Sequence, residues 1–256
     1  MNYLWFVAII AMLCWSGSDI FSKIGSPQND KNSHFKVGIA VGLVMGLHAI
    51  YMVTFGGVQL TLQDIINYLP ASALYILSMV IGYIGLRYIE LSISSPICNG
   101  SGAVAAIMSM IFFGVTFNPD SEGNEVFLNI PIIIGILLIV AGIISLGIVD
   151  NLENPELRAQ RQLKANRKYA KSVFAILLPV LYCIIDSLGT FVDTLIADGY
   201  SDKYEGLPGI ADAELYAGDV LNTAYEFTWM FIAIIFAYSA ETNLPGLDKL
   251  IGSSTK

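Results

Sequence analysis

Long apolar runs separated by short polar segments dominate this chain. Each run is about 17 to 25 residues long, the length that a helix needs to cross a bilayer, and none alternates between apolar and polar positions as a strand would. Because lipid cannot satisfy the hydrogen bonds of the backbone, helices are the expected structure. The runs are Tyr3–Ile24, Val37–Phe55, Leu69–Ile89, Pro96–Phe117, Ile130–Val149, Val173–Ile196 and Val220–Ala240.

Composition agrees with this pattern. The 256 residues are 55% hydrophobic and 13% charged, whereas soluble domains carry about 25% charged residues. The predicted fold class is therefore an all-α polytopic membrane protein with seven transmembrane helices. The formal net charge of -8 argues against a nucleic-acid partner. The three cysteines stand apart from one another and from His, so neither a metal site nor a cofactor is predicted.

The basic residues give the chain an orientation. With seven crossings, every Lys and Arg except Lys203 falls on the same side of the membrane. The positive-inside rule then places the N-terminus outside and the basic connector, residues 151–172, in the cytoplasm. The expected location is the cell membrane, plasma or inner, with several passes.

The connector also divides the chain. Residues 1–150 carry five predicted helices, and residues 173–256 carry two, together with an acidic loop at 197–219 and a polar tail. The sixth helix begins much as the first does, since aligning Asp19 with Asp186 sets Trp15 against Tyr182. Five helices per unit would make the two units inverted repeats, the plan of many secondary transporters.

Two segments carry a resemblance to a known family. They are Leu13-Cys14-Trp15-Ser16-Gly17 with Lys23 in the first helix, and the run from Gly82 to Ile97 that leads into Asn99-Gly100-Ser101-Gly102-Ala103. In these segments the chain resembles EamA-like members of the drug/metabolite transporter superfamily. The resemblance implies ten helices in two five-helix repeats, with the fourth helix lining a central cavity.

The chain departs from that family after the connector. Two predicted helices follow where the family has five, so the second repeat is expected to be incomplete. A truncated ten-helix protein and a complete seven-helix protein both fit this pattern.

Asp186 is the leading candidate for function. It lies in the middle of an apolar run, where an unpaired charge costs at least about 2.5 to 3.5 kcal/mol, so such residues face a bundle interior, a partner or water. We expect it to bind a proton or a substrate. Asp193 shares its helix face but lies near the membrane exit, where solvation explains it.

Other polar and aromatic residues form a second group of candidates. Glu226 lies between Tyr225 and Trp229, an arrangement that can hold an organic cation, although an interfacial acid in an aromatic belt fits equally. His48 could relay protons, pair with an acid or simply pack. Asp19 has Lys23 four residues on, which predicts a local ion pair. The resemblance implies that Asn99, Trp15 and Tyr75 line the cavity, and Tyr182 is the counterpart of Trp15.

Two local patterns concern helix packing and helix ends. Gly38, Gly42 and Gly46 recur every four residues, which predicts a flat face that another helix can approach closely. Ser94 and Ser95 before Pro96 predict an N-cap and the start of a helix.

The expected function is secondary transport of a small polar metabolite, such as an amino-acid-like compound or an amine, by alternating access, with Asp186 as the candidate for proton coupling. An enzyme is not expected, because no paired-aspartate, HExxH or GxSxG pattern is present. A non-transporting seven-helix receptor or partner subunit is the alternative. The expected partners are a small-molecule substrate and the lipid bilayer, and a homodimer stays open.

Overall fold

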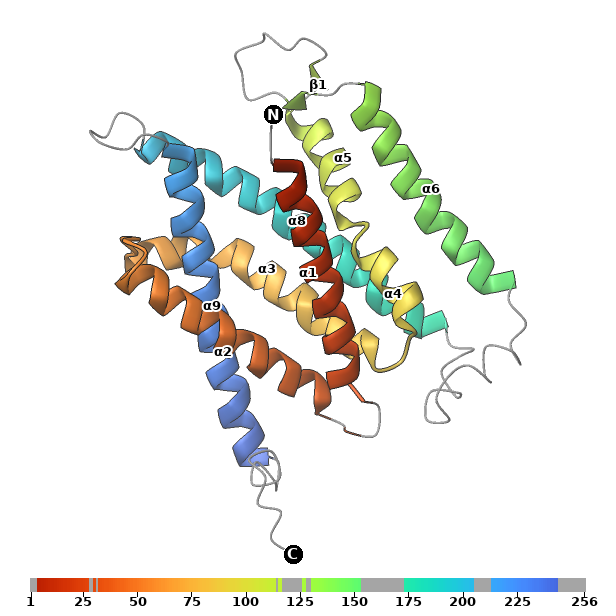
Figure 1. The fold of residues 1–256 in the computed structure, drawn as a ribbon, viewed down its shortest axis with the longest axis horizontal. Helices are drawn as coiled ribbons and strands as arrows, with labels where there is room; N and C mark the ends of the chain where they lie inside the picture. The colour runs from red at the N-terminus through yellow and green to blue at the C-terminus, as the bar shows by residue number, and fades with distance from the viewer. Residues whose placement is uncertain are drawn as a thin grey trace, which may run out of the picture. The chain divides into compact units, whose positions relative to one another are not determined.

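Helices make up nearly all of the described chain (Figure 1). The computed structural model describes residues 4–27, 30, 32–113, 115–116, 126–127, 130–152, 173–204 and 213–243. Each of the seven predicted apolar runs coincides with a helix, the fourth being split into α4 and α5, which confirms the all-helical prediction. The helices are α1 (Leu4–Gly25), α2 (Ser33–Thr54), α3 (Leu62–Leu86), α4 (Leu91–Cys98), α5 (Ser101–Phe113), α6 (Ile130–Leu152), α8 (Val173–Tyr204) and α9 (Ala213–Asn243). The two-residue strands β1 (Val115–Thr116) and β2 (Val126–Phe127) pair in parallel.

Five helices of the described chain are long and apolar enough to cross a membrane: Ser33–Thr54, Leu62–Leu86, Leu91–Phe112, Leu177–Ala197 and Gly218–Tyr238. Large apolar side chains stay exposed on their outer faces, as Val44 and Leu47 do at 68% each. Exposed apolar surface of this kind marks a membrane interaction. Together these features indicate a membrane-embedded protein. Seven crossings and their orientation stay predictions.

The chain forms two compact units. Unit 1 comprises residues 1–34 and 77–191, and unit 2 comprises residues 35–76 and 192–256. The helices α3 and α8 contribute residues to both units. The division into repeats at the connector stays a prediction. Most of that connector, part of the acidic loop and the polar tail lie outside the described residues.

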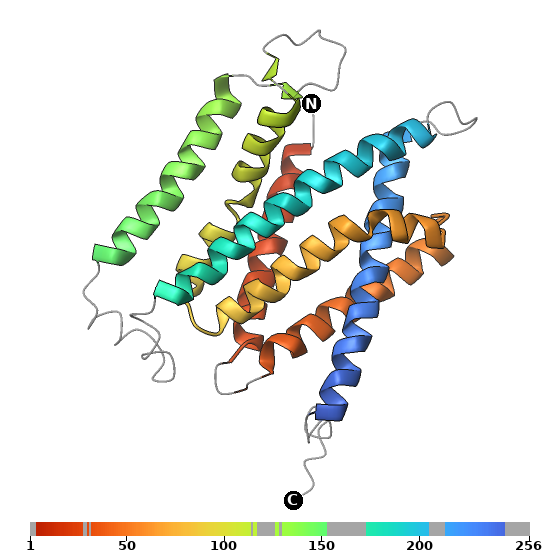
Figure 2. The same cartoon turned by 180° about the vertical axis from the view of Figure 1, so that it is seen from behind.

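In unit 1, α4 packs between α1 and α6, and α6 also runs beside α5 (Figures 1 and 2). The fourth apolar run is interrupted at Asn99 and Gly100, between the end of α4 and the start of α5. A side chain at position 100 would come within 2.2 Å of Ile143 Cδ1 on α6. The glycine therefore lets α6 lie directly against the interruption.

The expected helix start before Pro96 is wrong. Helix α4 begins at Leu91, its N-cap residue is Glu90, and Pro96 lies inside the helix. Because proline has no amide hydrogen, the carbonyl of Ser92 lacks its usual helical donor. Ser95 does not cap a helix. Its hydroxyl donates a hydrogen bond to Asp19 of α1, which is a tertiary contact.

The expected ion pair between Asp19 and Lys23 is also wrong, because it is absent from the described part of unit 1. The Lys23 ammonium instead donates hydrogen bonds to the backbone carbonyls of Leu86 and Ile89, the latter at 2.5 Å. Leu86 is the last residue of α3, where carbonyls have no helical donor and the helix dipole favours a positive charge. Lys23 thus ties α1 to the end of α3.

In unit 2, the glycine face of α2 packs against α9, as predicted. A Cβ atom at Gly42 would lie 2.6 Å from the carbonyl oxygen of Trp229 and 2.6 Å from Ala233 Cβ. At Gly46 it would lie 2.5 Å from Met230 Cγ. The two helices therefore approach each other as closely as their backbones allow. A neighbouring apolar cluster joins α3 to α9 through the buried residues Val58, Tyr68, Ala71, Val220, Leu221 and Ala224.

The close approach of α2 and α9 predicts a large cost for a single added methyl group. We expect Gly42→Ala to lower the free energy of unfolding by about 1 to 3 kcal/mol, because the backbone of α9 must move. Gly17→Ala on α1 is the matched control, since a Cβ there has nothing within 4 Å. It should raise stability by about 0.5 to 1 kcal/mol. Denaturant unfolding in micelles, followed by circular dichroism, measures both; equal effects would contradict the packing.

Candidate functional site

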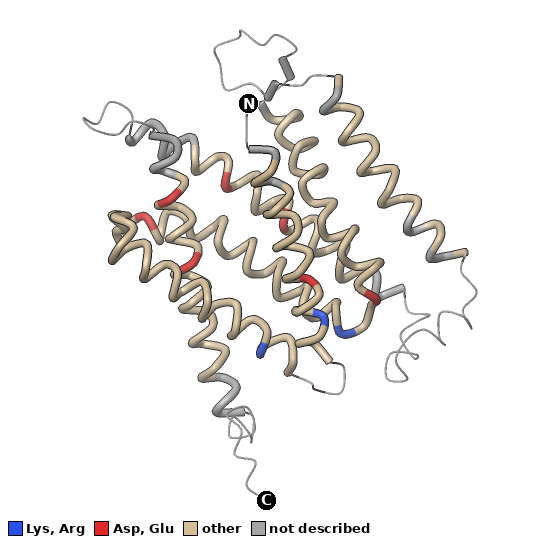
Figure 3. Tube along the Cα trace, viewed as in Figure 1, with Lys and Arg blue, Asp and Glu red and all other residues tan. Residues whose placement is uncertain are grey.

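The described helices carry carboxylates in both units, whereas basic side chains are few (Figure 3). The acids Asp19, Asp186, Asp193 and Glu226 lie within apolar stretches of these helices. Their partners show what each one can do.

Asp186, in unit 1, is held by two serine hydroxyls. Ser78 of α3 donates to Oδ1 at 3.1 Å, and Ser101 of α5 donates to Oδ2 at 2.7 Å. Ser187 reinforces the arrangement, because its hydroxyl contacts the carbonyl oxygen of Ser101 at 2.9 Å. Within the described residues no Lys, Arg or His forms an ion pair with Asp186. The carboxylate is therefore compensated by neutral hydrogen bonds, without a counter-charge.

Asp19 lies in a second hydrogen-bonded chain of unit 1. Ser95 donates to Asp19 Oδ2, and the Asn99 side-chain amide donates to Ser95 Oγ at 3.0 Å. Two predicted site residues, Asp19 and Asn99, are thus joined through one serine. Trp15, one turn before Asp19, is 55% exposed.

Tyr182 and Cys98 each lie near both acids of unit 1. Both side chains lie within electrostatic range of Asp19 and of Asp186. Tyr182 is buried against Gly82, and its hydroxyl lies 3.5 Å from Met79 Sδ. Unit 1 therefore brings Asp19, Asn99, Tyr182 and Asp186 into one polar region, which is lined by hydroxyls and lacks a described cation paired with either acid.

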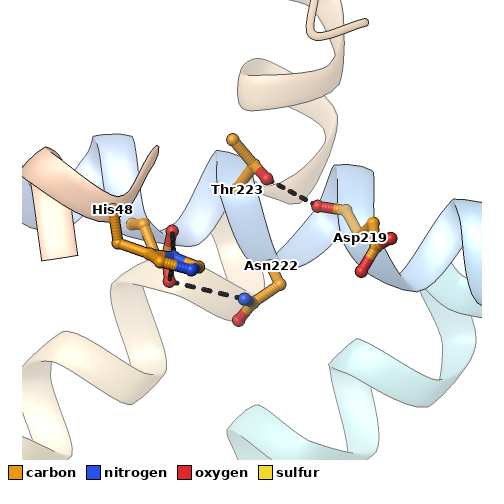
Figure 4. Close-up of polar contacts among 5 residues, drawn as sticks. His48, Asp219, Asn222 and Thr223 are labelled. Carbon is orange, nitrogen blue, oxygen red and sulfur yellow. Dashed lines mark hydrogen bonds and ion pairs between the residues drawn. The ribbon is translucent and has the colours of Figure 1, made fainter. Parts of the chain in front are cut away.

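Glu226 and His48 form a hydrogen-bonded pair in unit 2 (Figure 4). His48 Nδ1 lies 2.8 Å from Oε1 and 2.9 Å from Oε2 of Glu226. Because an ionised carboxylate only accepts, Nδ1 is the nitrogen that carries the hydrogen. The Glu226 side chain is 10% exposed and that of His48 is 50% exposed. Of the roles open to His48, the structure shows pairing with an acid.

Neighbouring residues of α9 complete this site (Figure 4). The Asn222 amide lies 3.4 Å from Glu226 Oε1, and the Thr223 hydroxyl donates to the backbone carbonyl of Asp219 at 2.7 Å. The Asp219 residue itself is exposed. Glu226 thus has hydrogen-bond donors from both α2 and α9.

The aromatic residues expected beside Glu226 have other contacts. Trp229 is fully buried, and its indole N–H donates to the Tyr225 hydroxyl at 2.8 Å. The ring of Tyr225 packs edge-on against Tyr75, with centroids 5.8 Å apart. Trp229 therefore stabilises the packing of α2 against α9 and positions the Tyr225 hydroxyl. The Glu226 carboxylate contacts His48 instead of these rings.

Sequence reasoning missed the serine donor Ser78 and assigned Ser95 to a helix cap, whereas it did place Ser101 among the hydrogen-bonding groups of the fourth apolar run. A serine in an apolar helix is common, and nothing in its neighbours along the chain distinguishes one that faces an acid. The sequence interpretation explained Asp193 by solvation, but its carboxylate accepts a 2.6 Å hydrogen bond from Tyr68 in unit 2. No group of three or more His, Cys, Asp and Glu side chains that could hold a metal ion occurs within the described residues.

No family model, curated protein or solved structure matches the chain. The site must therefore be interpreted from its own geometry.

The His48–Glu226 contact predicts coupling between two substitutions. Glu226→Gln and His48→Gln should each lower the free energy of unfolding. The double variant should lose about 0.5 to 2 kcal/mol less of this free energy than the sum of the two single losses. The reason is that the second change removes a group that the first change has already left unpaired. A double-mutant cycle of unfolding free energies in micelles measures this term. Additive losses would mean that the pair contributes nothing.

Proposed function

We propose that this protein is a secondary transporter that moves a small polar metabolite across the cell membrane by alternating access, with Asp186 as the coupling residue. The observation that carries the proposal is the bonding of Asp186. A carboxylate inside an apolar helix is held by Ser78 and Ser101, without a described cationic partner.

This bonding favours a coupling residue over a structural ion pair. A purely structural acid at membrane depth is expected to be neutralised by a fixed Lys, Arg or His. Neutral hydroxyls lower the cost of the charge, since a hydrogen bond to a charged group contributes about 1.5 to 3 kcal/mol, but they leave the charge itself in place. A proton or a cationic group of the cargo can then supply the missing positive charge.

The second acid of unit 1 supports the same function. Asp19 is also bonded to a hydroxyl, and Asn99 adds an amide beside it. A region with two carboxylates, hydroxyls and an amide suits cationic or zwitterionic cargo. Alternating access requires two conformations in which this region faces opposite sides. Seven crossings with the N-terminus outside belong to the same proposal, and the lengths of the apolar runs and the distribution of Lys and Arg support them. Membership of the EamA-like group also belongs to it, and the resemblance in the segments around Trp15 and Pro96 supports that membership.

The test is proton-linked flux in proteoliposomes. The wild-type protein is reconstituted with a pH-sensitive dye trapped inside, a pH gradient is imposed, and a panel of small amines and amino acids is added. At least one compound should change the internal pH. Asp186→Asn keeps the shape of the side chain and should reduce this flux about tenfold or more, the equivalent of one charged hydrogen bond.

Asp219→Asn is the matched control, because it makes the same chemical change at an exposed carboxylate. It should leave the flux unchanged. Absence of flux with every compound would reject the transporter and favour the alternative of a non-transporting receptor or partner subunit. Full flux in Asp186→Asn would reject Asp186 as the coupling residue.

A further inference from the structure

Helix α2 has an exposed seam in unit 2, apart from the glycine face that packs on α9. The residues of this seam recur at alternating spacings of four and three along the helix. They are Ala40, Val44, Leu47, Tyr51 and Thr54, and all five are exposed. The spacing places the side chains in one line, the pattern by which two helices pack side by side. A further helix can therefore lie on α2 while α9 keeps its place.

His48 lies beside this seam and carries an unused acceptor. Its Nδ1–H donates to the Glu226 carboxylate, and a neutral imidazole has only one N–H, so Nε2 is left as an acceptor. Among the described residues Nε2 takes part in no hydrogen bond, although the side chain is 50% exposed. Because Nδ1 faces the buried carboxylate, the edge of the ring that carries Nε2 faces away from it.

Tyr51 supplies the matching donor one turn further along α2. Its ring stacks on that of His48, with centroids 6.4 Å apart, and the residue is 56% exposed. Side chains of a helix lean toward its N-terminus, and the stack shows that Tyr51 leans over His48 instead of toward the end of the helix. The Tyr51 hydroxyl has no hydrogen-bond partner in the part of the chain that the structure describes.

Lipid cannot satisfy this donor and this acceptor. Both residues lie within the span Ser33–Thr54, and hydrocarbon offers no hydrogen bonds. Polar side chains in transmembrane helices accordingly face the interior of a bundle, a water-filled cavity or a neighbouring helix. An exposed donor beside an exposed acceptor on an apolar seam points to a helix that carries the complementary pair.

A second copy of this chain presents that pair at the required depth. Copies inserted in the same orientation associate around a two-fold axis along the membrane normal, so residues with the same number lie at the same depth. Tyr51 of one copy then lies within one helical turn of His48 in the other copy, and the contact occurs twice. An unrelated helix would need its own donor and acceptor at the same spacing. The seam of α2 is therefore complementary to itself.

We propose that this protein forms a dimer through α2, in which the Tyr51 hydroxyl of each copy donates to Nε2 of His48 in the other copy. Val44 and Leu47 pack along the two-fold axis and exclude lipid from these hydrogen bonds. Each Glu226–His48 pair is thereby extended into the other copy. The dimer requires neither flux nor Asp186, so it is independent of the proposed transport.

The experiment is energy transfer between full-length copies that carry a donor or an acceptor fluorescent protein at the C-terminus. They are reconstituted together in phosphatidylcholine vesicles at decreasing protein-to-lipid ratios, and the wild-type signal should follow a monomer–dimer equilibrium. Tyr51→Phe keeps the ring and should weaken association about eightfold or more, because two hydrogen bonds are lost. Tyr238→Phe makes the same change at an exposed ring of α9. It should associate within about twofold of wild type.

Mixed dimers test the reciprocal contact directly. Combining His48→Leu with Glu226→Leu removes the acceptor together with the carboxylate, so no buried charge is left unpaired. A Tyr51→Phe copy paired with this double variant retains one of the two hydrogen bonds. The mixed dimer should therefore be about threefold tighter than the dimer of either variant alone. General loss of structure in the variants would not make the mixed dimer the tighter one.

Disulfide crosslinking identifies the face that is used. In a chain whose three cysteines are replaced by alanine, Leu47→Cys should crosslink two copies, since equal residues near a two-fold axis approach each other. Leu138→Cys on α6 is the matched control, because Leu138 is 67% exposed and Leu47 is 68% exposed. The control should remain largely uncrosslinked.

The outcomes separate the dimer from the transporter. A protein that is monomeric at every ratio, association that Tyr51→Phe does not weaken, or equal crosslinking at the two positions would each overturn the proposed dimer. A dimer with the expected dependence on Tyr51 in a protein that moves no compound would keep this inference and reject transport. Flux by a monomer would do the reverse.

Discussion

A polar group inside an apolar helix has to find its partner within the protein, and this requirement determines which helices meet. Lipid offers no hydrogen bonds, so each buried carboxylate or ammonium is costly until another segment satisfies it. Lys23 reaches the end of α3, Asp186 takes hydroxyls from α3 and α5, and Glu226 takes the His48 ring from α2. Each contact joins segments that are far apart in the sequence. The same contacts that hold a unit together therefore form its candidate sites.

Apolar packing contributes in a different way. Dispersion between side chains is not directional, so the glycines of α2 matter chiefly because they remove obstacles between two backbones. Gly42 and Gly46 bring α2 and α9 close enough for His48 to reach Glu226. The polar pair then selects one register from the several that a smooth glycine face would permit. The glycines thus determine how closely the two helices approach, and the neighbouring His48–Glu226 pair determines their register.

The helices could be predicted from the sequence because length and apolarity are local properties. The glycine face could be predicted for the same reason, since its spacing lies on one helix. The hydrogen-bond partners of the polar side chains could not be predicted, because they depend on which helix faces meet. Lys23 has Asp19 at ideal helical spacing, yet free carbonyls at the end of α3 compete successfully for its ammonium. Pro96 resembles a helix start only if α4 begins there, and α4 begins at Leu91. Asp193 near a membrane exit gives no hint that Tyr68 lies opposite.

The packing of α2 on α9 limits how this chain can evolve. Positions 42 and 46 meet Ala233 and Met230 with no room for an extra methyl group. Substitutions on one helix are tolerated only when the other helix gives up volume, so these positions should change together or not at all as the sequence diverges. Such paired changes would identify distant descendants of the same ancestor after most of the remaining apolar surface, which tolerates exchange among Leu, Ile and Val, had lost its resemblance.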